Sequence, residues 1–94
     1  MTIEERCKKY ISMTEKALEL VKVSVPNESF LSSGARDFLE MCKNYLADSK
    51  YFFSKKDYEN SLAASSYAYA WLDAGVRLGL LAAPNDYVRF TQYS

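Results

Sequence analysis

Apolar side chains recur along this chain at intervals of three and four residues, which is the spacing of amphipathic helices. The apolar positions of the first segment are Ile3, Cys7, Tyr10, Ala17 and Val21. Thr2 and Glu5 fit a capping box at its start, and Pro26 ends it because proline lacks a backbone donor. The pattern predicts a first helix over about residues 2–23.

Two further segments repeat this pattern. The stripe of the second consists of Phe38, Cys42, Tyr45, Ser49 and Phe52. It predicts a helix over about residues 33–54, with Ser32 and Ser33 as candidate caps. Asp57 is the candidate cap of a third helix over about 57–82. Because so few residues separate the second and third helices, we expect them to form an antiparallel hairpin.

The expected fold class is all-α. We predict one helical domain over residues 1–94, a three-helix up-and-down bundle with a short C-terminal tail at 84–94. No strand pattern of useful length precedes residue 86. The tail carries Tyr87, Phe90 and Tyr93 at three-residue spacing, so it either folds over the hairpin or orders against a partner.

The third segment has apolar residues on two sides. One row contains Tyr58, Leu62, Ser65, Tyr69, Leu72 and Val76. A second row, roughly opposite, contains Tyr67, Trp71, Ala74 and Leu78. A three-helix bundle needs one buried face per helix, and tyrosine and tryptophan are enriched at interfaces. We therefore predict that Tyr67, Trp71 and Leu78 bind a partner.

Asp73 and Arg77 lie on a narrow polar strip between these rows, together with Glu59 and Ser66. Their four-residue spacing, with the acid first, suits an ion pair within one helix. Arg77 can alternatively bridge to Glu40 or Asp48 of the second helix. A functional interpretation makes Asp73 and Arg77 a polar recognition edge beside the second apolar row.

Composition excludes several kinds of chemistry. The chain has no histidine, which removes the commonest general base and metal ligand. No catalytic constellation, metal site or cofactor site is expected, and the prediction is that the protein is not an enzyme. Two cysteines, Cys7 and Cys42, and a charged start without a secretory signal favour the reducing cytoplasm. Two charges within residues 61–83 argue against a membrane span.

The sequence KDYE at residues 56–59, followed by SYAYAWLDAG at 66–75, resembles the signature of a family of small archaeal proteins known only as a domain of unknown function. The resemblance extends through YLADSKYF at residues 45–52 and more weakly into the first helix. It implies a three-helix bundle like those of immunoglobulin-binding and albumin-binding modules. It implies no activity.

These features predict a cytoplasmic helical interaction module that either self-associates as a homo-oligomer or docks on a protein partner. The alternative is an accessory domain that binds RNA or a nucleotide beside a nucleotidyltransferase-like partner. It would stack bases on exposed tyrosines and meet phosphate with Lys8, Lys9, Lys55 and Lys56. The 12 basic and 12 acidic residues cancel, which weighs against nucleic acid.

Overall fold

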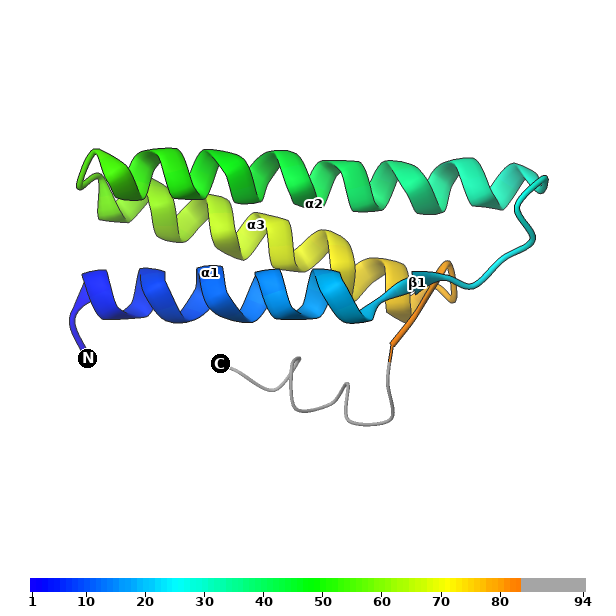
Figure 1. Ribbon diagram of the computed structural model, residues 1–94, viewed down its shortest axis with the longest axis horizontal. Coiled ribbons are helices and arrows are strands. Elements are labelled where there is room, and N and C mark those ends of the chain that lie inside the picture. Colours follow the sequence, from blue (N-terminus) through cyan, green and yellow to red (C-terminus); the bar gives the residue numbers. More distant parts are fainter. Residues whose placement is uncertain (84–94) are drawn as a thin grey trace.

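The computed structural model of this protein describes residues 1–83. The elements follow in the order α1 (Ile3–Leu20), β1 (Lys22–Val23), α2 (Phe30–Ser54), α3 (Tyr58–Arg77) and β2 (Leu81–Ala82). Figure 1 shows the helices alternating in direction, with α3 lying between α2 and α1. The all-α bundle and its antiparallel α2–α3 hairpin are confirmed. The tail predicted at residues 84–94 lies outside the described residues.

The start of α1 agrees with the sequence prediction, but its end does not. Thr2 Oγ1 accepts the Glu5 N–H at 3.1 Å, and Glu5 Oε1 accepts the Thr2 N–H at 3.3 Å, so the capping box is formed. The helix ends at Leu20, short of the expected residue 23. The β-branched Val23 prefers an extended backbone, and β1 pairs antiparallel with β2, with Lys22 opposite Ala82 and Val23 opposite Leu81.

The second helix begins earlier than the sequence suggested. Ser29, not Ser32 or Ser33, caps α2, and its hydroxyl accepts the Ser32 N–H at 3.1 Å. The Ser32 side chain is buried and donates instead to the carbonyls of Asn27 and Ser29, at 2.7 and 2.8 Å. Ser32 therefore ties the loop before α2 to the helix, and α2 starts at Phe30.

The cap of α3 is the one predicted, and Asp57 Oδ1 accepts the Asn60 N–H at 3.4 Å. The helix ends at Arg77, five residues before the expected 82. Gly79 adopts a left-handed φ of 78°, and the Leu80 N–H reaches back to the Gly75 carbonyl at 3.0 Å. This is a Schellman stop, and it turns the chain so that β2 can pair with β1.

The core runs along α3. Its buried cluster consists of Ala17, Val21, Ala35, Cys42, Leu46, Ala68, Leu72 and Leu81. These residues come from all three helices, the segment after α1 and β2. The short β1–β2 pair thus closes one end of the bundle.

Candidate protein-binding surface

The buried side of α3 is built mostly of small residues. Its buried residues are Ser61, Ala64, Ser65, Ala68, Leu72 and Gly75, all of them small except Leu72. Small side chains let helix axes approach closely, and α3 packs against both α2 and α1, which contact each other much less. The first apolar row contributes Ser65 and Leu72 to this buried face, and its other members are partly buried. The second row is not exposed along its whole length, because Trp71 and Ala74 are partly buried.

Trp71 is partly buried and packs edge-on against Phe38 of α2, with ring centroids 5.0 Å apart and an interplanar angle of 84°. Its indole Nε1 is buried and finds no acceptor within residues 1–83. Of the three predicted partner-binding residues, Trp71 is the partly buried one, whereas Tyr67 and Leu78 are exposed. It forms the base of the candidate surface.

Tyr67 projects further into solvent. Its side chain is 59% exposed, and its ring stacks on Tyr45 of α2, with centroids 4.9 Å apart and planes inclined by 22°. More than half of Tyr67 remains exposed to solvent despite this stack. Sequence analysis placed Tyr45 in the core stripe of α2, and only the packing of α2 on α3 reveals that it supports the surface.

Leu78 follows the last turn of α3 and is 67% exposed. Between Tyr67 and Leu78 the same side of the helix carries Ala70, which is exposed, and Ala74, which is partly buried. The structure therefore places Tyr67 and Leu78 on one continuous apolar strip, with Trp71 along its inner margin. We call Tyr67, Ala70, Ala74 and Leu78 the α3 strip.

The polar edge is formed within α3. Arg77 Nε donates to Asp73 Oδ1 at 2.9 Å, and both side chains are accessible to solvent. Within residues 1–83, no ion pair joins Arg77 to Glu40 or Asp48. An exposed pair of this spacing contributes about 0.2–0.5 kcal/mol to helix stability, so Asp73 and Arg77 form a polar rim beside the α3 strip at little energetic gain.

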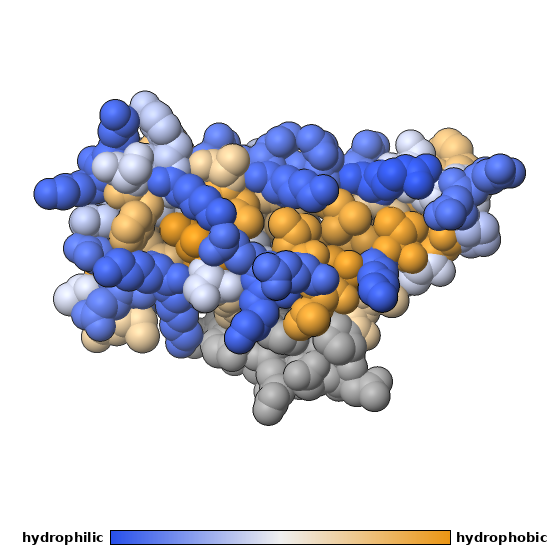
Figure 2. Space-filling view, in the orientation of Figure 1, coloured by the Kyte–Doolittle hydropathy of each residue, from blue (hydrophilic) through white to orange (hydrophobic). Residues whose placement is uncertain are grey.

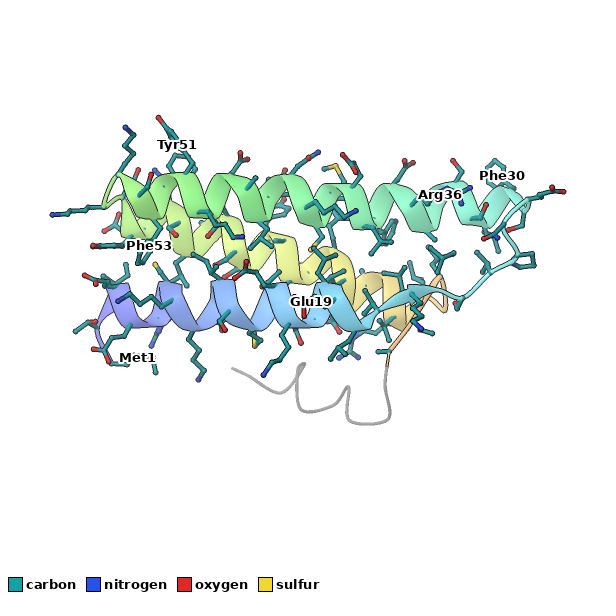
Figure 3. All side chains as sticks on the ribbon, in the orientation of Figure 1. Met1, Glu19, Phe30, Arg36, Tyr51 and Phe53 are labelled. Atoms are coloured by element: carbon teal, nitrogen blue, oxygen red, sulfur yellow. The ribbon has the colours of Figure 1, made fainter. Side chains whose placement is uncertain are left out.

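A second feature was missed by the sequence analysis. A cavity of about 220 Å³ lies between α1 and α2, lined by Lys8, Ile11, Ser12, Glu15, Lys50 and Phe53. Figure 2 shows apolar surface gathering between these two helices, and Figure 3 shows Phe53 between them. The Glu15–Lys50 ion pair, at 2.5 Å, joins α1 to α2 beside this cavity. No local sequence signal reports the separation of two helices, so the cavity could not be foreseen.

Two features of residues 1–83 concern metal binding and thiol chemistry. Residues 1–83 contain no group of three His, Cys, Asp or Glu side chains that could hold a metal ion. Cys7 and Cys42 are free and buried. Burial raises the pKa of the Cys42 thiol to about 12, although nearby Lys43 acts in the opposite direction. Within the same residues no helix has the length and apolarity that a membrane span requires.

The comparisons with known proteins concern family and fold. A family model described as a protein of unknown function, DUF357, matches residues 9–81. The crystal structure of protein AF1782 from Archaeoglobus fulgidus, assigned to the same family model, is similar to this fold with a TM-score of 0.71. The two sequences are 21% identical, and the match covers 87% of this chain and 93% of that chain. No curated protein matches the chain.

Proposed function

This chain belongs to the DUF357 family of proteins of unknown function, as the resemblance in its sequence indicated, and we propose that it binds another protein through the α3 strip. The observation that carries the proposal is the exposure of two large apolar side chains, Tyr67 and Leu78, on one side of a helix that packs against α2 and α1. Covering water-exposed apolar surface of this kind with a partner lowers the free energy and therefore favours binding.

The anatomy of the surface suits a protein partner. Tyr67 and Trp71 are held by stacking and edge contacts with α2, so they would lose little conformational entropy on binding. Aromatic side chains fixed in this way are typical anchors of protein interfaces. Asp73 and Arg77 would form a polar rim around an apolar centre.

The proposal is for a binding function without catalysis, in the cytoplasm. A sequence without histidine gives no support to imidazole-based acid–base chemistry. Two free, buried thiols, Cys7 and Cys42, are typical of a reducing compartment.

Nucleic-acid binding has weaker support. Two of the four lysines that would meet phosphate are engaged already: Lys8 pairs with Glu4 at 3.5 Å, and Lys55 lies over the Tyr51 ring at 5.7 Å. A protein that neutralises phosphates needs a basic surface, and the charges of this chain cancel. RNA is therefore an outcome of the test below and not a second proposal.

The test is capture of proteins from the native cytosol on the immobilised full chain, with two disrupting variants and one matched control. Tyr67→Asp and Leu78→Asp each place a charge on the α3 strip. Tyr51→Asp is the control because Tyr51 is 60% exposed, as Tyr67 is. Figure 3 shows Tyr51 on the edge of α2, directed away from the other helices.

We expect the same proteins to bind the wild-type chain and Tyr51→Asp, and to be lost from Tyr67→Asp and Leu78→Asp. All three variants should retain the wild-type helical circular dichroism. If Tyr67→Asp and Leu78→Asp capture the same proteins as the wild type, the partner binds elsewhere and the proposal fails. It also fails if ribonuclease treatment abolishes capture, because the bound molecule is then RNA.

A further inference from the structure

The exposed side of α3 also indicates which partner it fits. We propose that the partner is a second copy of this chain, packed with its α3 antiparallel to the first α3 through the α3 strip. This inference rests on the proposed function, since it names the occupant of the same surface. It is argued below from the spacing of the strip and from the charges at its two ends.

The strip has the spacing of a helix–helix contact. Extended by the exposed Ala63 at its start, it reads Ala63, Tyr67, Ala70, Ala74 and Leu78, separated by four, three, four and four residues. Alternation of four and three residues keeps one side of a helix in register with a neighbouring helix. The 20 residues of α3 span about 30 Å, so such a contact can extend over several turns. A straight helix of similar length and character is the complementary shape.

The charges beside the strip determine the direction of that helix. Glu59 lies in the first turn of α3 and Arg77 in the last, on the same polar edge. In a symmetric parallel pair this edge of one helix lies on the opposite side of the contact from the same edge of the other, so Glu59 and Arg77 would not pair. In an antiparallel pair each Glu59 faces Arg77 of the second copy, twice by symmetry. The opposed helix dipoles favour the same arrangement.

Both charged groups are able to make this contact. Within residues 1–83 no ion pair involves Glu59. Arg77 bonds Asp73 through Nε, and because a guanidinium carries five N–H donors in a fork it can also hold a second carboxylate. The two chains therefore complement each other in charge without breaking the Asp73–Arg77 pair.

The Glu59–Arg77 pairing also fixes the register. The residue midway between them is Ala68, so the twofold axis crosses α3 at that level. Ser66 of one copy then lies opposite Ala70 of the other, and both side chains are small and exposed. Two small side chains thus meet near the twofold axis, and Tyr67 lies beside them, where it would cover the second copy.

The experiment is sedimentation velocity of the full chain at micromolar concentration, with charge-reversal variants. We expect a dimer, and we expect Glu59→Arg or Arg77→Glu to raise its dissociation constant about tenfold, because each creates two like-charge contacts. Combining the two substitutions should restore dimerisation. Glu40→Arg, on the exposed side of α2, is the control and should leave the dimer unchanged.

A disulfide test reports the register. Mixing Ser66→Cys with Ala70→Cys should give a mixed cross-link under mild oxidation, and neither variant should cross-link efficiently to itself. Background from Cys7 and Cys42 is low because both thiols are buried. Efficient Ala70→Cys self-cross-linking, or failure of the double charge reversal to restore the dimer, overturns the antiparallel arrangement.

The outcomes separate this inference from the proposed function. A wild-type chain that stays monomeric in sedimentation overturns the inference of a second copy. If that monomer still captures a protein in a manner that depends on Tyr67 and Leu78, the proposed function stands with a different partner. If neither dimerisation nor capture depends on those two residues, both fail.

Discussion

Ser49 of α2 and Ser61 of α3 donate hydrogen bonds to each other's backbone: Ser49 Oγ to the Ser61 carbonyl at 2.7 Å, and Ser61 Oγ to the Ser49 carbonyl at 2.9 Å. Both side chains are completely buried. Two serines facing each other bring the helix backbones close enough for each hydroxyl to reach the opposite carbonyl. This reciprocal pair fixes how α2 and α3 lie on each other, and with it the position of Tyr45 beneath Tyr67.

Replacing either serine by alanine should weaken the fold moderately. Ser49→Ala removes a hydrogen-bond donor. The Ser61 carbonyl is still part of the backbone hydrogen bonding of α3, so the substitution leaves no buried polar group without a partner there. We expect a loss of about 1 kcal/mol in the free energy of unfolding, measured by urea denaturation. The double variant should lose less than the sum of the singles, because the two hydroxyls share one contact.

A bulkier residue at the same point should cost more. Ser49→Val adds volume where the helices are closest, and overpacking typically costs about 1–3 kcal/mol. If Ser49→Val were as stable as Ser49→Ala, the close approach of α2 and α3 at this level would be wrong.

Gly75 marks a second close approach. A Cβ built on Gly75 would lie 2.5 Å from Leu81 Cδ1, 2.9 Å from Leu81 Cγ and 3.4 Å from Phe38 Cδ2. Leu81 is buried in β2 and has little room to move. We expect Gly75→Ala to lower the free energy of unfolding by about 1 kcal/mol, since overpacking outweighs the gain in helix propensity. Gly75→Ala should cost less in a Leu81→Ala background, where the clash is absent, and chemical denaturation of the two single variants and the double variant measures the difference.

Gly34 provides the matched control for Gly75. It lies in α2, and a Cβ there would meet no atom within 4 Å. Gly34→Ala should therefore raise the free energy of unfolding by about 0.5–1 kcal/mol through helix propensity alone. Equal effects of alanine at both glycines would contradict the packing of α3 against β2.

Features fixed by neighbouring residues were predictable from the sequence. The capping box of Thr2 and Glu5 and the Asp57 cap each depend on residues three apart, and both are formed. The pairing of β1 with β2 was not predictable, because it joins Val23 to Leu81 across the whole α2–α3 hairpin. Two-residue strands carry no alternation that a pattern could detect.

The candidate surface shows the same division. Helical spacing placed Tyr67, Trp71 and Leu78 on one side of α3, which depends only on helix geometry. How much of each is covered depends on where α2 lies. Phe38 packs edge-on against Trp71, whereas Leu78 lies beyond the last turn of α3 and is exposed. The exposure of each residue in this row therefore could not be predicted from the sequence of α3 alone.

The turn between α2 and α3 holds a lysine in a backbone conformation that favours glycine. Lys56 has a φ of 61°, and the N–H groups of Lys56 and Asp57 close the helix on the carbonyls of Phe53 and Phe52. A residue with a Cβ is strained in this left-handed backbone conformation, whereas glycine is not. Lys56→Gly should raise the free energy of unfolding by about 0.5–1 kcal/mol in urea denaturation.

The adjacent lysine is the control for that substitution. Lys55 has a φ of −91°, which any residue adopts. Lys55→Gly should therefore lower the free energy of unfolding. Glycine relieves no strain at this position and only raises the conformational entropy of the unfolded chain. A loss of stability in Lys56→Gly equal to that in Lys55→Gly would show that the left-handed turn is not formed in solution.

Cys42 should make the fold sensitive to alkaline pH. Its thiol is completely buried, and desolvation raises its pKa from about 9 to about 12. An unfolded chain loses this proton near pH 9 while the folded chain keeps it, so stability is present in full below pH 9 and falls as the pH rises toward 12. The slope contributed by one such group reaches about 1.4 kcal/mol per pH unit. Urea denaturation from pH 7 to 11 measures it.

The comparison that isolates the thiol is with Cys42→Ala. This variant should be less stable than the wild type at pH 7, because it leaves a small cavity. Its stability should fall less steeply above pH 9, so the two curves converge, since tyrosine and lysine titrations are common to both proteins. Curves that stay parallel to pH 11 would mean that the Cys42 thiol ionises in the folded chain as easily as in water, and hence that the contact between α2 and α3 opens to solvent.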